Sequence, residues 1–249
     1  MFLKSFLNLL PDIEQEIPNF PPTFLYNEGW LLRLVVDWFY HSEIPDHPLS
    51  VPGGGHWFSE ARLPSAFLPR FKGDPLAESH TNADGVIGQF TIGSKGKTDL
   101  VLNPDANHFV VLEAKMYSGL SKGVTHAKYF DQAARSVACM AEVLKRAVCT
   151  PTDLSCLGFH VLAPDEQIKS RTFSRNLDKR SIVDKVERRV SSYEGERDDW
   201  FRNWFKPTVE RIEIHPISWE AILNLIVEKD SRTGKSLEQY YSQCLAVNS

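Results

Sequence analysis

The sequence predicts an α/β fold in which a mixed β-sheet is flanked by helices. Two observations predict this fold: helix-period and strand-period apolar segments alternate along the chain, and the strands are joined both by short turns and by one long helix. The composition agrees, because 42% hydrophobic and 24% charged residues over a length of 249 are ordinary for a globular protein with one substantial core. We expect a single domain over residues 1–249.

The first strong helix signal covers residues 24–41. Asn27 can cap this helix, and Glu28 then lies in its first turn, where the helix dipole favours a negative charge. The next segment, residues 42–82, is rich in Pro and Gly, and we expect it to be long and irregular with little regular structure.

Three strands are predicted next, over residues 85–92, 98–102 and 109–116. Residues 93–96 and 103–107 between them are typical of turns, so we expect the three strands to form an antiparallel meander. Side chains alternate between the two faces of a strand, and the pairing of the strands therefore decides which polar residues can meet.

A long helix is predicted over residues 129–147, and a strand follows over 157–162. Because parallel strands need a long crossover, a parallel connection through this helix is the economical one. Residues 181–204 then predict a further helix, 211–217 a late strand and 219–228 a closing helix. This order of elements indicates a layered α/β core.

The charge balance limits how the protein can bind a polyanion. The formal net charge is −4, so the chain is not a basic nucleic-acid coat, and a polyanion has to be held by a local patch or through metal ions. One stretch is locally basic, with Lys169, Arg171, Arg175, Lys179, Arg180, Lys185, Arg188 and Arg189. A solvated helix face is the interpretation that we favour, and a phosphate-contacting surface is the alternative.

Cysteine usage and the start of the chain bear on the compartment. The four cysteines show no C-x-x-C spacing, which indicates small buried residues in a reducing environment. The apolar segment 1–10 is short and acidic residues follow it at once, so we expect no signal peptide. No apolar run reaches the length of about 18 residues that a transmembrane helix needs. We therefore expect a cytoplasmic protein with no membrane segment.

One strand carries the residues that point to chemistry. Glu113 and Lys115 share one face of the strand 109–116, which is otherwise apolar and typical of a buried strand. Asp99 lies in the neighbouring predicted strand and can face the same site if the register permits. Asp99, Glu113 and the carbonyl of Ala114 could then hold Mg²⁺, or Mn²⁺ in its place, because hard cations take oxygen ligands.

Lys115 could orient an attacking water or offset charge on a phosphate. Glu28 heads the apolar face of its helix, where it either stabilises the helix start or aids the metal cluster. Gln132 lies at the start of the helix 129–147, and alone it would be a polar residue at a helix terminus.

Together these pieces resemble the PD-(D/E)XK nuclease superfamily, whose members share a restriction-endonuclease-like core. The resemblance implies such a core over about residues 24–164 and a C-terminal α/β extension over about 165–249. It also implies site roles for these residues: metal binding by Asp99 and Glu113, catalysis by Lys115, and supporting roles for Glu28 and Gln132.

Two positions depart from the family pattern. Thr98 precedes Asp99 where many members have Pro, and Ser136 stands where one branch has Tyr. The function implied is a Mg²⁺-dependent nuclease that hydrolyses phosphodiester bonds, with DNA as its partner. The alternative is a catalytically silent protein of this fold that binds nucleic acid or a protein partner. Many nucleases of this fold act as dimers, so a homodimer or a larger assembly is also implied.

Overall fold

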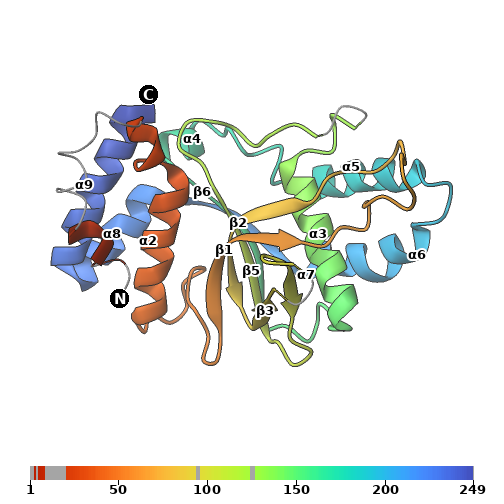
Figure 1. Cartoon of the computed structure of the whole chain (residues 1–249), viewed down its shortest axis with the longest axis horizontal. Helices are drawn as coiled ribbons and strands as arrows, with labels where there is room; N and C mark the ends of the chain where they lie inside the picture. The colour runs from red at the N-terminus through yellow and green to blue at the C-terminus, as the bar shows by residue number, and fades with distance from the viewer. Residues whose placement is uncertain (1–2, 4, 9–20, 94–95, 124–126, 249) are drawn as a thin grey trace.

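The computed structural model describes residues 3, 5–8, 21–93, 96–123 and 127–248. Its centre is a five-stranded sheet with helices on both faces (Figure 1). The strands of this sheet are β1 (His56–Leu63), β2 (Thr81–Gly88), β5 (His108–Ala114), β6 (Cys156–Ala163) and β7 (Glu213–Ser218). The helices include η2 (Pro22–Phe24), α2 (Glu28–His41), α3 (Gln132–Ala147), α4 (Asp165–Lys169), α5 (Lys179–Ser191), α6 (Asp198–Trp200), η3 (Phe201–Phe205), α7 (Lys206–Arg211), α8 (Trp219–Lys229) and α9 (Ser231–Asn248).

The sheet is mixed, as the sequence predicts. Its strand order is β1-β2-β5-β6-β7, in which β1, β2 and β5 pair antiparallel while β5, β6 and β7 pair parallel. Helix α3 connects β5 to β6, so the predicted parallel crossover is confirmed. The predicted late strand and closing helix are also present, as β7 and α8.

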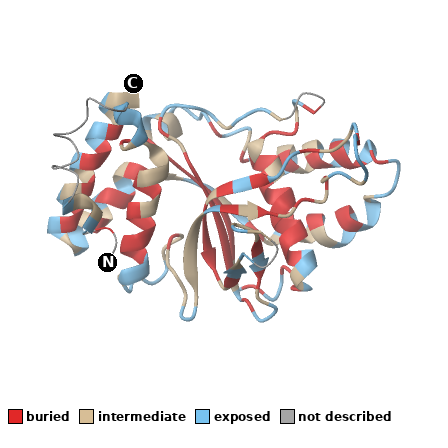
Figure 2. Ribbon diagram, viewed as in Figure 1, coloured by how far each residue is buried: buried red, intermediate tan, exposed pale blue. Residues whose placement is uncertain are grey.

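Strand β5 separates two apolar clusters. Phe109 and Val111 pack in the cluster that includes α3, α5 and α7, whereas Val110 and Leu112 pack in the cluster that includes α2, α8 and α9. All four side chains are fully buried, and Figure 2 shows the sheet buried between the two groups of helices. Successive side chains of a strand point to opposite faces, so an uninterrupted apolar run is what a strand covered on both faces needs.

The predicted antiparallel meander is wrong. Strand β2 pairs directly with β5, while β3 (Phe90–Ile92) and β4 (Leu100–Leu102) form a separate two-stranded sheet. The apolar run 85–92 breaks after Gly88, which has φ 150° and approaches the next strand closely. A Cβ atom there would lie 2.2 Å from the carbonyl oxygen of His108, so only glycine fits.

Other predicted boundaries also need correction. The segment expected to be irregular contains β1 and the start of β2. The helix predicted over 181–204 ends at Ser191, and Glu194 and Gly195 follow with positive φ before α6 begins. Helix α9 was not predicted. Part of the N-terminal segment on which the signal-peptide expectation depends, including residues 9–10, lies outside the described residues. Among the described helices, none combines the length and apolarity that crossing a membrane demands.

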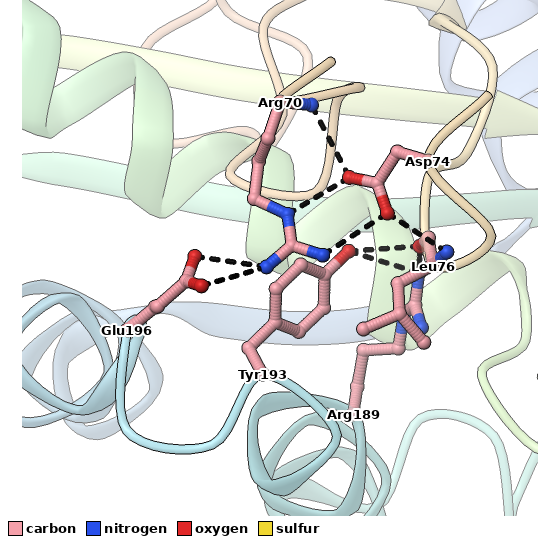
Figure 3. Close-up of polar contacts among 6 residues, drawn as sticks. All are labelled: Arg70, Asp74, Leu76, Arg189, Tyr193 and Glu196. Carbon is pink, nitrogen blue, oxygen red and sulfur yellow. Dashed lines mark hydrogen bonds and ion pairs between the residues drawn. The ribbon is translucent and has the colours of Figure 1, made fainter. Parts of the chain in front are cut away.

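A polar clasp fastens the loop after β1 to the end of α5 (Figure 3). The guanidinium of Arg70 donates to Asp74 at 2.8 Å and to Glu196 at 2.9 Å. The hydroxyl of Tyr193 donates to the carbonyl of Leu76 at 2.8 Å. The contacts of Arg70 with Glu196 and of Tyr193 with Leu76 join residues more than a hundred positions apart in the chain, so they hold the loop against the helical layer that contains α3.

Candidate functional site

The candidate site lies where β2 and β5 separate. The last backbone pair between them is Gly85 with Leu112. Beyond it, the backbone N–H of Ala114 donates to the Asp84 carboxylate at 2.8 Å. The Asp84 side chain thus replaces a backbone acceptor of β2 in this hydrogen bond between the strands. Extending the register by one residue sets Asp84 opposite Glu113. Two carboxylates therefore meet across the strand pair.

Glu113 is held by groups from two elements. Its side chain is 2% exposed, and its carboxylate accepts a hydrogen bond from Lys115 Nζ at 2.7 Å. The side-chain amide of Gln132, the first residue of α3, donates to the same oxygen of Glu113. Asp131 caps α3 by accepting from the backbone N–H of Ala134, which fixes where the helix begins and hence where Gln132 lies.

Burial and the neighbouring carboxylate both disfavour ionisation of Glu113. Desolvation is the largest cause, and the negative charge of Asp84 is the next; together they raise the pKa of Glu113 to about 8. The ammonium of Lys115 acts in the opposite direction and lowers this pKa. A divalent cation between the two carboxylates would relieve their repulsion, which is a feature of metal sites that bind hard cations.

Lys115 has a fixed backbone and a mostly enclosed side chain. Its N–H donates to the carbonyl of Leu162 at 2.8 Å, and its carbonyl accepts from the indole of Trp219 at 2.9 Å. Trp219 is completely buried, and the side chain of Lys115 is 12% exposed. The backbone contacts of Lys115 therefore fix the position from which its ammonium group reaches Glu113.

A third carboxylate lies on β1. The register of β1 with β2 sets Glu60 opposite Asp84, between the pairs Ser59–Gly85 and Ala61–Ala83. Burial and then the charge of Asp84 raise the pKa of Glu60, while Arg33, which lies 3.3 Å away, lowers it. Glu60 is more exposed than Glu113, so it borders the site rather than lying inside it.

The structure does not bring Asp99 to Glu113. Asp99 makes an isolated bridge with Arg62 of β1, and the two side chains form an ion pair. The register on which the predicted site depended does not exist, because the antiparallel neighbour of β5 is β2. Asp84 occupies the position expected for Asp99. The local sequence shows only that Asp84 immediately precedes the strand predicted from residue 85, and it does not show which strand pairs with β5.

Glu28 and Gln132 differ in their placement. Gln132 contacts Glu113 and also accepts from the backbone N–H of Ser121 at 3.0 Å. Glu28 lies in the first turn of α2 near Cys244 of α9. The pKa of the Cys244 thiol is raised to about 12, first by burial and then by the negative charge of Glu28. The structure thus joins Gln132 to Glu113 and Lys115, and it gives Glu28 a different neighbour.

The donor set fits a hard cation. In the described parts of the chain, no group of three or more His, Cys, Asp or Glu side chains is arranged to hold a metal. Two carboxylates, Asp84 and Glu113, are present, and the carbonyl of Ala114 faces the same side as its N–H. Mg²⁺ is commonly bound by one or two carboxylates, with water and substrate phosphate as the other ligands, whereas zinc sites need more protein ligands.

Comparison of the chain with protein-family models, with curated proteins and with solved structures found no match.

Proposed function

We propose that this protein is a metal-dependent nuclease that hydrolyses phosphodiester bonds in DNA. One observation carries the proposal: Asp84, Glu113, Lys115 and Gln132 form one connected group at the end of the β2–β5 pair. Two neighbouring carboxylates with an adjacent ammonium group suit the hydrolysis of a phosphodiester, in which water attacks the phosphorus and the P–O bond to one ester oxygen breaks. Asp84 and Glu113, with the Ala114 carbonyl, would hold Mg²⁺ or Mn²⁺.

Each side chain has a separate task in this reaction. The metal, when bound, supplies Lewis-acid stabilisation of the charge that develops on the phosphate. Lys115 orients the attacking water or donates to a phosphate oxygen, because its ammonium lies at hydrogen-bond distance from Glu113 and can turn toward a bound substrate. Gln132 holds the carboxylate of Glu113 in one orientation through its amide.

The order of elements supports a restriction-endonuclease-like core. Helix α2, the antiparallel strands β1, β2 and β5, helix α3 and the parallel strand β6 follow one another in the order that the family resemblance implies. In this assignment Asp84 takes the metal-binding role that the sequence alone gave to Asp99. Ala83 then stands before the Asp where many members of the superfamily have Pro.

Cleavage of single- and double-stranded DNA, with Mg²⁺ or Mn²⁺, tests the proposal. Wild type should cut at least one substrate, and Lys115→Ala should lower the rate by about a hundredfold or more, because a charge that stabilises the transition state is lost. Circular dichroism should show that the variant is folded. Full activity of Lys115→Ala would exclude Lys115 from the site.

The alternative is a catalytically silent protein of the same fold. The observation that favours it is that Lys115 and Gln132 both donate to one oxygen of Glu113, which leaves fewer free lone pairs for a metal. Calorimetry with Mg²⁺ separates the two candidates. Absence of binding together with absence of cleavage would favour the silent protein.

A further inference from the structure

A groove of about 840 Å³ lies between the loop before α3 and the start of α5. Six basic and three acidic side chains line this groove, although the whole chain has a net charge of −4. The basic ones are Lys122, Lys128, Arg175, Arg180, Lys185 and Arg188, and the acidic ones are Asp131, Asp178 and Asp184. The groove therefore has an excess of positive charge, although the protein as a whole is acidic.

Two of the six cations have partners inside the groove. Lys185 donates to Asp131 at 2.7 Å, and the guanidinium of Arg188 lies 3.9 Å from the centre of the Tyr129 ring. The other four are exposed, and none of them forms an ion pair with an acidic side chain in the described ranges. These four, which we call the groove cations, are Lys122, Lys128, Arg175 and Arg180. Their charges are available to an anionic ligand.

Asp131 fixes the walls of the groove. Besides capping α3, it accepts from the amide of Asn176 and from Lys185, each at 2.7 Å. It thereby ties the start of α3 to the turn before α5 and to α5 itself. The groove cations consequently lie on segments that already contact one another, so fewer residues need to become ordered when an anionic ligand binds.

The groove adjoins the candidate site. Ser121, between the groove residues Leu120 and Lys122, exchanges two hydrogen bonds of 3.0 Å with Gln132: its carbonyl accepts from the backbone N–H and its own N–H donates to the side-chain oxygen. The amide of the same Gln132 side chain donates to Glu113. Gln132 thus connects the segment that lines the groove to the site.

We infer that this groove binds the phosphodiester backbone of the nucleic-acid strand that enters the candidate site. The inference rests on the proposed function and names the surface that positions its substrate. Lysine and arginine side chains neutralise backbone phosphates and release counterions, so binding here depends strongly on salt and weakly on base sequence. DNA and RNA share this backbone chemistry, and separate substrates distinguish them.

The test compares two quadruple variants with the same change of charge. The groove variant combines Lys122→Gln, Lys128→Gln, Arg175→Gln and Arg180→Gln. The control variant combines Lys72→Gln, Arg202→Gln, Lys235→Gln and Arg232→Gln, which are exposed cations outside the groove lining. Fluorescence anisotropy in EDTA measures binding to double-stranded DNA, single-stranded DNA and single-stranded RNA over a series of KCl concentrations.

The groove variant should bind at least about tenfold more weakly than the control variant. The slope of log affinity against log salt should fall by about 3, because each lost phosphate contact removes about 0.7 to 0.9 from it. Two double variants, Lys122→Gln with Lys128→Gln and Arg175→Gln with Arg180→Gln, should each give about half of this effect. Equal affinities and slopes for the groove and control variants would overturn the inference.

Hydrolysis of bis(p-nitrophenyl) phosphate separates this inference from the proposed function. This small phosphodiester has no polymer backbone, so the groove variant should hydrolyse it at the wild-type rate. Loss of nucleic-acid binding in the groove variant, with no hydrolysis by wild type, would support the groove and contradict the nuclease. A loss of affinity seen with RNA alone would assign the groove to an RNA backbone.

Discussion

Gln132 links the start of a helix to a buried carboxylate. Its side-chain oxygen accepts from Ser121 while its amide donates to Glu113, so both ends of the side chain are fixed. A side chain held at both ends can orient Glu113 without contacting the substrate. Gln132 is therefore expected to act as a positioning residue.

Gln132→Ala should lower kcat for DNA cleavage by about tenfold or more and should leave KM nearly unchanged, because loss of a partner that orients a metal ligand typically costs this much. Mg²⁺ affinity, measured by calorimetry, should fall as well. An increase in KM with unchanged kcat would instead place Gln132 in substrate binding.

His160 is a buried histidine that the candidate site does not use. It is 1% exposed in β6, and its ring stacks on that of His215 with centroids 5.9 Å apart. The pKa of His160 is lowered from 6.5 to about 4, mainly by burial and to a smaller extent by the neighbouring His215. The folded protein therefore keeps this imidazole neutral at a pH where the unfolded chain protonates it.

The free energy of unfolding should consequently fall as the pH decreases from about 6.5 to 4, by up to about 1.4 kcal/mol per pH unit from this residue. Above this window both states are neutral and His160 contributes no slope. His160→Gln should flatten the dependence in urea titrations between these pH values. Identical slopes for the wild type and the variant would contradict the assignment.

Asp84 shows why part of the site could not be predicted from the sequence. Glu113, Lys115 and Gln132 were identified because strand alternation and the family resemblance single them out locally. The partner carboxylate depends on which strand pairs with β5, a long-range fact that local pattern does not contain. The supporting role of Glu28 stays a prediction, because helix periodicity gives the face of a helix but not the element that packs against it.

At the scale of elements, the clasp around Arg70 offers a stability test. Hydrogen bonds and charge from Arg70 lower the pKa of Asp74, whose side chain is fully enclosed, while Glu196 is half exposed. Arg70→Gln leaves an enclosed carboxylate without its cation, which is costly, whereas Glu196→Gln removes only an exposed partner.

Arg70→Gln should therefore lower Tm by several degrees, and Glu196→Gln should lower it by much less. Differential scanning calorimetry at neutral pH measures both. Equal shifts would show that Asp74 does not depend on Arg70.

The elements that were predicted well are those with strong internal patterns. Strands β5 and β6 have continuous apolar runs, and α3 has a clear helical period, so their order and parallel pairing followed from the sequence. Strand β1 was missed because it lies within a segment rich in Pro and Gly. Helix α9 is largely polar outside its buried face, so its apolar periodicity is weak.

At the scale of the whole molecule, the sheet divides the protein into two apolar clusters, and the candidate site lies on the side of α3. The groove cations lie on the same side, near α3 and α5. The residues of the proposed catalytic site and the groove cations therefore lie in one half of the protein. The half with α2, α8 and α9 buries the other face of the sheet (Figure 1).

In the proposed site Asp84, rather than Asp99, acts together with Glu113 and Lys115. The most direct test of this role is metal-dependent DNA cleavage by Asp84→Asn beside the matched variant Asp99→Asn. Asp84→Asn should lose about a hundredfold of activity or more and should bind Mg²⁺ more weakly, because a metal ligand is removed. Asp99→Asn should cut within about twofold of wild type, since Asp99 pairs with Arg62 outside the site. Full activity of Asp84→Asn would exclude Asp84 from the metal site.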